Sequence, residues 1–460
     1  MDRREFIKLA GVGLGSAALL SCTSKRWETM KQNYYLQGNY APVKQIVSET
    51  NLNVIGEIPN ELSGIYMRNG PNPMGSPNNK KYHWFTGEGM LHGVRIDSGK
   101  ALWYRNRIVG NEASNSSQPN THVISNGDKI YATVEAGGAP VEINSELESL
   151  PTTPFDGTLN SAFSAHTKLD AQTDELHAMC YEFPRGSYQV HHVIVGKNGT
   201  IQAAHPIDLP SKTMLHDCAI TENCMLILDL SVTFSLSKLA TGYFPFAWDK
   251  KHVTRIGVVD RKHRSETVKW FEINPCYFFH TVNAHEDESG NIVLDAMRYE
   301  RLFDTDPNGP LTESSPFLTR WTLNRENGSS SEERLDDIPS EFPRIHPLLD
   351  GQFNRYTYTL GVGPLPHPDF GRLMKYDLVY NSSEVHEFGV GMHGAEPIFI
   401  PSQNAKSEDD GYLMTYVYDQ SIDKSNLQIF HAQDISTGPI AQIQFSQRVP
   451  FGFHGNWFAT

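Results

Sequence analysis

Four histidines stand in short, unusual contexts that could hold a metal ion. They lie in the segments SAHTKLD, MLHDCAIT, FFHTVNAHE and FGFHGNW, as His166, His216, His280 and His454. A single histidine of this kind is more often a hydrogen-bonded residue of a core or loop than a metal ligand. Neutral imidazole is nevertheless the commonest metal ligand in proteins. A set of four therefore makes a metal site the first hypothesis to examine.

Longer segments between these histidines resemble those of a known family. They are GIYMRNGPNP, YHWFTGEGMLH, EFPRI and GAEPIFIP, beginning at Gly64, Tyr82, Glu341 and Gly394. With the histidine motifs they extend from about residue 50 to the C-terminus. In these motifs the chain resembles the carotenoid cleavage oxygenases. The resemblance implies an all-β fold, a seven-bladed β-propeller with a few short helices and long loops over the iron face.

The resemblance also implies a non-haem iron centre on the propeller axis. In that family four neutral imidazoles hold one Fe(II) per chain, and O2 is the co-substrate. The implied ligands here are His166, His216, His280 and His454. No catalytic residue is implied beyond this iron site. His83 and His92, in the second family segment, are predicted to be structural.

Three glutamates in the family accept the distal N–H of ligand histidines and so fix their tautomer and orientation. The matching positions are Glu135 in TVEAGGAP, Glu341 in EFPRI and Glu396 in GAEP. A glutamate taken singly is normally a solvated surface residue. Glu396 stands between alanine and proline in an apolar segment, which favours burial.

The resemblance implies cleavage of a C=C bond of an apolar polyene by O2, giving two carbonyl products. Family members that cleave stilbenes usually carry a lysine directly before the glutamate that matches Glu135. This chain has Val134 there. We therefore expect a carotenoid or apocarotenoid substrate. Stilbene cleavage, isomerisation, and non-catalytic binding of a polyene or lipid remain alternatives, although the complete set of histidines and glutamates argues against loss of catalysis.

The elements that must position these residues read as short strands. β-branched and aromatic runs are bounded by Gly, Asn or Asp at 123–136, 224–230, 255–261, 290–299 and 411–419. The polar segments 325–333 and 402–411 are predicted to be loops. The intervals between the four histidines are 50, 64 and 174 residues. The seven blades that the resemblance implies would take roughly 60 residues each over residues 33–460, so the intervals correspond to one, one and three blades. They are consistent with a different inner strand for each histidine.

Composition limits the class of protein further. The chain has 460 residues, a formal net charge of −14 and no runs of Lys or Arg, which argues against a nucleic-acid partner. We expect residues 33–460 to form a single catalytic propeller domain and the protein to be a monomer.

The N-terminus is predicted to be a targeting segment. Residues 1–22 place Arg3 and Arg4 before a short apolar stretch, which is typical of a twin-arginine signal and too short to span a bilayer. The sequence LLSC resembles a lipoprotein cleavage site that would leave Cys22 lipidated, although an incidental cysteine is the alternative. Residues 23–32 are then a linker, and the protein is periplasmic or a membrane-anchored lipoprotein.

Two further features leave alternatives open. Cys218 and Cys224 flank a short turn and would be able to form a disulfide in an oxidising compartment, although free thiols are favoured. The segment 236–248 contains Pro245, which limits any helix, and is either a membrane-contacting patch like one in related enzymes or an ordinary loop. The residues of such a patch are Leu236, Leu239, Tyr243, Phe244, Phe246 and Trp248.

Overall fold

The computed structural model describes residues 33–110, 119–136, 138–151, 153–160, 162–181, 188–261, 267–366 and 368–460. The predicted signal segment 1–22, with Cys22, and the linker 23–32 lie outside the described residues. Helices in the described part are short: η1 (Tyr34–Leu36), η2 (Gly38–Tyr40), η3 (Pro154–Gly157) and α2 (Leu236–Ala240). None of them is long and apolar enough to cross a membrane.

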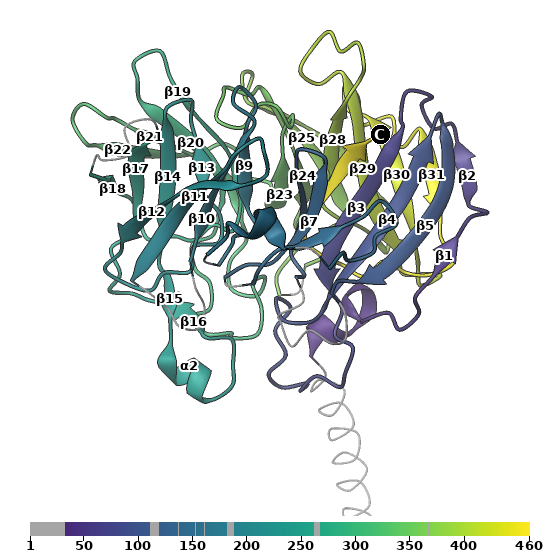
Figure 1. The fold of residues 1–460 in the computed structure, drawn as a ribbon, viewed down its shortest axis with the longest axis horizontal. Coiled ribbons are helices and arrows are strands. Elements are labelled where there is room, and N and C mark those ends of the chain that lie inside the picture. The colour runs from purple at the N-terminus through teal and green to yellow at the C-terminus, as the bar shows by residue number, and fades with distance from the viewer. Residues whose placement is uncertain are drawn as a thin grey trace, which may run out of the picture.

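The strands of the described residues form seven successive blades of a β-propeller (Figure 1), as predicted. Blade 1 has the order β1-β5-β4-β3-β32 and contains β1 (Ser48–Glu49), β3 (Gly64–Pro71), β4 (Gly89–Asp97), β5 (Lys100–Ile108) and β32 (Gly455–Ala459). Blade 2 contains β6 (His122–Asn126), β7 (Lys129–Thr133) and β8 (Val141–Ile143). Blade 3 has the order β12-β11-β10-β9 and contains β9 (Thr167–Asp170), β10 (Glu175–Cys180), β11 (Gln189–Val195) and β12 (Ile201–Asp208).

The other four blades follow the same antiparallel plan. Blade 4 contains β13 (Ala219–Ile220), β14 (Cys224–Asp229), β17 (Arg255–Asp260) and β18 (Lys269–Glu272). Blade 5 contains β19 (Thr281–Glu286), β20 (Ile292–Arg298), β21 (Phe317–Leu323) and β22 (Ser330–Arg334). Blade 6 contains β23 (Ser340–Arg344), β24 (Tyr356–Gly361), β25 (Arg372–Asp377) and β26 (Ser382–Glu387). Blade 7 contains β2 (Asn53–Gly56), β27 (Met392–Gly394), β28 (Ile398–Pro401), β29 (Gly411–Asp419), β30 (Lys424–His431) and β31 (Ala441–Gln444).

The ring is closed by strands from both ends of the described chain. The C-terminal strand β32 pairs with β3 in blade 1, from Gly64 opposite Ala459 to Arg68 opposite Gly455. The N-terminal strand β2 pairs with β31 in blade 7. In Figure 1 the yellow C-terminal strands accordingly lie beside the purple N-terminal ones. Pairing of this kind occupies strand edges that would otherwise be open to aggregation.

A separate hairpin interrupts blade 4. Strands β15 (Val232–Phe234) and β16 (Phe246–Trp248) pair with each other, and α2 lies between them in the sequence. Hairpin and helix project from the lower end of the molecule in Figure 1. The prediction that proline at position 245 limits helix formation agrees with the five-residue length of α2.

The predicted strands are all present, and one loop prediction is partly wrong. Residues 123–136 form the hairpin of β6 and β7, and the other four ranges correspond to β14, β17, β20 and β29. The segment 325–333 was expected to be a loop, but residues 330–334 form β22, the outermost strand of blade 5. Its polar, largely exposed side chains suit an edge strand that faces solvent. Residues 402–410 form a loop, as predicted.

Candidate metal centre

The innermost strands of the blades bring distant sequence motifs to one place. Strands β32, β6, β9, β13, β19 and β23 are the terminal strands of their sheets, and neighbouring pairs among them, such as β32 and β6 or β13 and β19, are in contact. Each of the four motif histidines precedes one of these strands by one to three residues. They are followed by β9, β13, β19 and β32 in blades 3, 4, 5 and 1, so their separations are one, one and three blades, as the intervals predicted.

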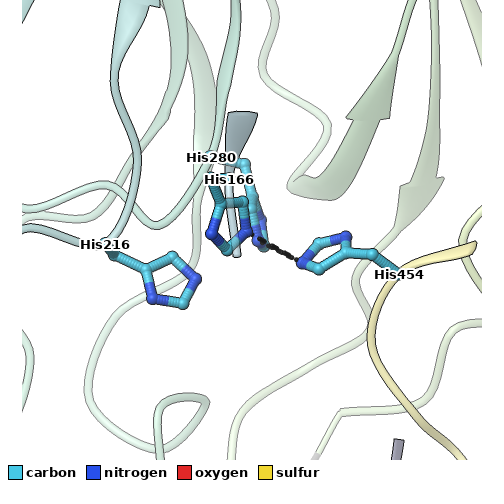
Figure 2. Close-up of side chains that lie close together, drawn as sticks. All are labelled: His166, His216, His280 and His454. Carbon is cyan, nitrogen blue, oxygen red and sulfur yellow. Dashed lines mark hydrogen bonds between the residues drawn. The ribbon is translucent and has the colours of Figure 1, made fainter. Parts of the chain in front are cut away.

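The four imidazoles meet at the centre of the ring. His166, His216, His280 and His454 are buried, and each offers one nitrogen such that all four nitrogens lie within 4.8 Å of one another. The Nε2 atom of His454 lies 3.0 Å from that of His166 and 3.1 Å from that of His280. Figure 2 shows His216 and His454 approaching this centre from opposite sides.

Three of these histidines are oriented by carboxylates. His166 Nδ1 donates to Glu135 Oε1 at 2.8 Å. The corresponding bonds run from His280 to Glu341 Oε2 at 2.6 Å and from His454 to Glu396 Oε1 at 2.8 Å. A proton on Nδ1 makes each of these contacts a hydrogen bond to a carboxylate oxygen. The Nε2 lone pair of each ring is therefore free to face the centre.

Local backbone features orient the carboxylates of Glu341 and Glu396 toward their histidines. The pairing of β23 with β24 shifts register between Glu341 and Arg344, and Phe342 within this bulge has a φ of 56°. A bulge of this kind redirects a side chain relative to a regular strand. Glu396 Oε2 also accepts the backbone N–H of Gly455 at 2.9 Å. A Cβ atom on Gly455 would lie 2.5 Å from the carbonyl oxygen of Met67, so only glycine allows β32 to approach β3 so closely after the histidine.

Burial sets the protonation of most of these rings. It lowers the pKa of His166 to about 3 and, with the neighbouring imidazoles, lowers the pKa of His216 and His454 well below the usual value. For His280, burial acts in the same direction, but the surrounding carboxylates, with Glu341 foremost, together outweigh burial and raise its pKa. Neutral imidazole is the form that binds metal ions.

His216 differs from the other three histidines. Its Nδ1 is buried and has no hydrogen-bond partner within the described part of the chain. Its ring packs instead against Phe279, with centroids 5.1 Å apart, and lies 6.1 Å from the ring of Phe85. Packing against neighbouring rings, rather than a hydrogen bond to a carboxylate, therefore fixes the orientation of this imidazole.

The donor set fits a transition metal that prefers nitrogen ligands. Imidazole suits Fe, Zn, Cu and Ni, whereas Mg²⁺ and Ca²⁺ prefer oxygen ligands. Two nitrogens that each lie about 2.1 Å from one ion at a right angle are about 3.0 Å apart, close to the two Nε2 separations given above. The four-histidine group is thus arranged as a metal site.

A large apolar cavity opens on one side of this centre. Its volume is about 930 Å³, and its walls include three of the four histidines, His216, His280 and His454. The rest of its wall is rich in aromatic side chains, among them Trp84, Phe85, Tyr181, Phe244, Phe279 and Phe453. Val134 also lines the cavity. Cavities of this size with mainly apolar walls are typical of small-molecule binding sites.

The sequence did not point to His122, although it lies beside the centre. It begins the inner strand β6, and its ring centroid is 5.1 Å from that of His454. Its Nδ1 is 3.0 Å from the carbonyl oxygen of Ala165, and its Nε2 is 3.3 Å from Asn456 Nδ2. Both ring nitrogens are thus engaged in hydrogen bonds. Only its place at the start of a predicted strand would have singled it out.

The remaining sequence predictions have mixed outcomes. Cys218 and Cys224 are buried free thiols, so the disulfide alternative is wrong for this structure. His92 is buried and its Nδ1 bonds to the hydroxyl of Tyr104 at 2.9 Å, in keeping with a structural role. His83 Nδ1 accepts the N–H of Phe85 at 3.1 Å, and the residue also contributes to the wall of the large cavity.

The apolar segment 236–248 is only partly exposed. Leu236 and Leu239 are 71% and 39% exposed. Tyr243, Phe244 and Trp248 are half-buried, and Phe246 is buried. The alternative of a patch made of all six residues is therefore wrong for Phe246, because the β15–β16 hairpin folds its side chain into the core.

A β-propeller whose axis carries a four-histidine centre beside an apolar cavity defines a narrow class of protein, and comparison with known proteins agrees with it. The family model for retinal pigment epithelial membrane protein matches residues 40–459. A carotenoid cleavage oxygenase of Mycobacterium tuberculosis is 36% identical, with 93% of this chain and 98% of that protein aligned. A carotenoid 9,10(9',10')-cleavage dioxygenase of Crocus sativus is 30% identical, over 92% and 89% of the two chains.

Solved structures share the fold. The crystal structure of Pseudomonas brassicacearum lignostilbene dioxygenase superposes with a TM-score of 0.86 at 26% identity, covering 93% of this chain and 99% of that one. A variant of Synechocystis apocarotenoid oxygenase gives 0.83 at 23% identity, over 92% and 98%. The chain belongs to the family of retinal pigment epithelial membrane protein and the carotenoid cleavage oxygenases, and it is an oxidoreductase of the dioxygenase type.

Proposed function

We propose that the protein is a non-haem Fe(II) dioxygenase that cleaves a C=C bond of a carotenoid or apocarotenoid with O2, giving two carbonyl products. One observation carries the proposal: three of the four clustered histidines form part of the wall of the large apolar cavity. The names of the Mycobacterium tuberculosis and Crocus sativus relatives support the substrate class.

The histidines, the glutamates and the aromatic cavity wall would have different roles in this reaction. His166, His216, His280 and His454 would hold the iron, which when bound supplies the O2 chemistry that side chains lack. The three glutamates keep a proton on Nδ1 of their histidines, so that Nε2 stays available. The aromatic wall of the cavity packs against a linear polyene and excludes water from it. Shape, rather than hydrogen bonding, would then select the bond that is cleaved.

One position of the cavity wall favours a polyene over a hydroxystilbene. Val134 occupies the wall position at which stilbene-cleaving relatives usually place a lysine, and it cannot bind a phenolate. Lys81 also lines the cavity, but its Nζ donates to the carbonyl oxygen of Thr241 at 2.6 Å. A polyene needs no such partner, because burial of its apolar surface contributes about 25 cal/mol per Å².

We expect the iron-loaded protein to convert a carotenoid or apocarotenoid in the presence of O2, with loss of visible absorbance. Hydroxystilbenes should have a kcat/KM at least about tenfold lower, equivalent to about 1.4 kcal/mol of transition-state discrimination. The measurement is a side-by-side assay of both substrate sets, with products identified by mass spectrometry and an anaerobic control. Replacing Val134 with lysine should shift the ratio toward stilbenes.

Other outcomes would replace the proposal. Efficient stilbene cleavage with inert polyenes would indicate a stilbene dioxygenase, the activity named for the Pseudomonas brassicacearum structure. A changed double-bond geometry without O2 uptake would indicate an isomerase. Tight polyene binding without any conversion would indicate a binding protein.

We also propose that the protein is exported by the twin-arginine route and anchored through Cys22. Replacing Arg3 and Arg4 with lysines should leave the protein in the cytoplasm, because the paired arginines are the export signal. Cys22→Ser should give an exported, soluble protein, which we expect to be monomeric by light scattering. Cell fractionation and immunoblotting measure both effects. Continued membrane attachment of the Cys22→Ser protein would rule out the lipid anchor.

We further propose that α2 touches a membrane surface where the substrate is taken up. Leu236 and Leu239 are exposed on this helix, and Gly242 and Tyr243 just beyond it line the cavity. In the soluble Cys22→Ser protein, replacing both leucines with serine should weaken binding to phospholipid vesicles by about tenfold or more, since each buried leucine contributes about 1.5–3 kcal/mol.

The matched control is Ile422→Ser, which removes an exposed aliphatic side chain from the turn between β29 and β30. This control should bind vesicles like the parent protein in a sedimentation assay. Equal binding by all three proteins would exclude α2 as a contact surface.

A further inference from the structure

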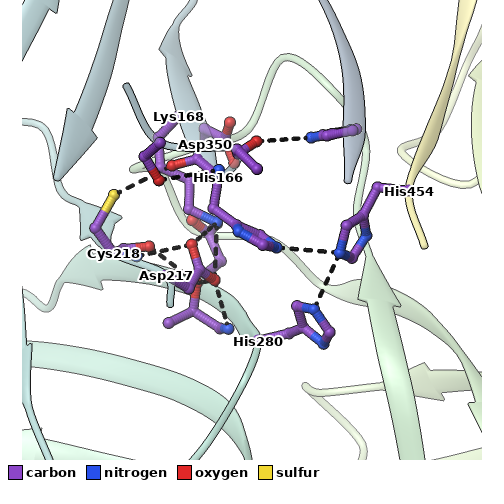
Figure 3. A network of polar contacts seen from close by, with 12 residues as sticks. His166, Lys168, Asp217, Cys218, His280, Asp350 and His454 are labelled. Carbon is purple, nitrogen blue, oxygen red and sulfur yellow. Dashed lines mark hydrogen bonds and ion pairs between the residues drawn. The ribbon is translucent and has the colours of Figure 1, made fainter. Parts of the chain in front are cut away.

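A buried carboxylate beside the metal centre joins three blades. The side chain of Asp217 is 1% exposed, and it accepts hydrogen bonds from strands on both sides of its own (Figure 3). Thr281 in blade 5 donates to Oδ2 from its backbone N at 2.8 Å and from Oγ1 at 2.7 Å. Lys168 in blade 3 places Nζ 3.1 Å from Oδ1. The backbone N–H of Cys218 in blade 4 donates to Oδ1 at 2.7 Å.

The partners of Asp217 stand next to the clustered histidines in the sequence. Lys168 follows His166 by two residues, and Thr281 directly follows His280. Asp217 itself directly follows His216. One carboxylate therefore connects the starts of three inner strands, each of which follows a histidine of the centre by one to three residues.

The charge on Asp217 strengthens these connections. Its carboxylate is almost fully buried, and its partners are the Lys168 ammonium and three N–H or O–H donors from Cys218 and Thr281. Hydrogen bonds to an ionised acceptor are about twice as strong as those between neutral groups. A charge this deeply buried persists only because it is paired and hydrogen-bonded.

His216 is the histidine that needs such support. The other three histidines of the centre each donate Nδ1–H to a glutamate, whereas Nδ1 of His216 has no hydrogen-bond partner among the residues described. Its ring packs against Phe279 and against the imidazoles of His166 and His280. The backbone that follows it is held by Asp217.

We propose that Asp217 is the positioning residue of His216, fixing through the backbone the one imidazole that has no carboxylate of its own. The inference rests on the proposed role of the four histidines as metal ligands. Asp217 does not touch the metal or substrate in this role. It sets where the His216 nitrogen lies relative to the other three.

A double-mutant cycle with Co(II) as the probe tests this inference. The Kd for Co(II) is measured by competition with a chromophoric chelator for the wild type, Asp217→Asn, His216→Ala and the double variant. Asp217→Asn should weaken Co(II) binding by about 10–100-fold, as loss of a supporting residue usually does. In the His216→Ala background the same change should add about twofold or less, because the residue through which it acts is gone. The ligand-field spectrum of Asp217→Asn should move toward that of His216→Ala.

The controls separate this inference from the proposed function. Asp350→Asn changes a nearby carboxylate that accepts the N–H of Leu169 in blade 3 at 3.0 Å, and it should leave the Co(II) Kd unchanged. If the wild type binds no Co(II), the proposed metal site itself fails. If the wild type binds Co(II) and the effects of the two single changes multiply, or if Asp217→Asn binds normally, only the positioning role fails.

A second pair of variants covers the case in which Asp217→Asn does not fold. Thr281→Val removes the Oγ1 hydrogen bond to Asp217 while keeping the backbone bond, and Thr281→Ser keeps both. Thr281→Val should weaken Co(II) binding, and Thr281→Ser should restore it. Equal affinity in both variants and the wild type would overturn the inference.

Discussion

His454→Ala should remove nearly all of the bound metal and the activity, the largest effect we expect from any single change. His454 is the imidazole whose Nε2 lies within 3.1 Å of two others, so its loss opens the centre on one side. It would also leave the buried Glu396 carboxylate without its 2.8 Å partner. Loss of an outer partner typically costs 10–100-fold in metal affinity, so loss of a direct ligand should exceed about 100-fold. Metal analysis of protein purified without oxygen measures the occupancy.

The control for this variant is His122→Ala. It removes a buried histidine whose ring is 5.1 Å from that of His454 but whose two nitrogens bond to Ala165 and Asn456. This protein should retain the wild-type metal content, and circular dichroism should report the same fold for both variants. Full occupancy in His454→Ala would show that this histidine is not a ligand.

Glu341→Gln should lower metal affinity or kcat/KM by about 10–100-fold, equivalent to about 1.4–2.7 kcal/mol, while the fold is retained. The carboxylate accepts His280 Nδ1 at 2.6 Å and the hydroxyl of Tyr299 at 3.0 Å. The glutamine amide can still accept one of these hydrogen bonds. It carries no negative charge, however, so it does not raise the basicity of the His280 nitrogen that would bind the metal. Metal titration and steady-state kinetics measure the change.

Glu286→Gln provides the same chemical change at the far end of strand β19. Glu286 accepts hydrogen bonds from Thr221 and Asn223, away from the histidine cluster. We expect normal metal affinity and kinetics for it. Indistinguishable behaviour of the two glutamine variants would mean that Glu341 has only a structural role.

Local patterns in the sequence were sufficient for the all-β class, whereas the seven blades and the four histidines were predicted from motifs that resemble those of the family. Short β-branched runs between Gly, Asn and Asp turns are a local signal, and they correspond to strands of the propeller. The histidines stand in distinctive motifs, and their intervals agree with whole blades, since each histidine directly precedes or lies just before a different inner strand. The glutamates were found only through the motifs of the family.

The tertiary structure determined the burial, strand pairing and long-range contacts of several residues, which no local sequence pattern predicts. Whether Phe246 is exposed depends on how a hairpin folds back, and the strand character of β22 comes from pairing with β21 rather than from its polar sequence. His122 and Asp217 gain their places from contacts between blades, which bring together residues tens to hundreds of positions apart. Hydrogen bonds and burial depend on distances of a few ångströms in space. The roles of these residues therefore follow from the folded propeller and not from their places in the sequence.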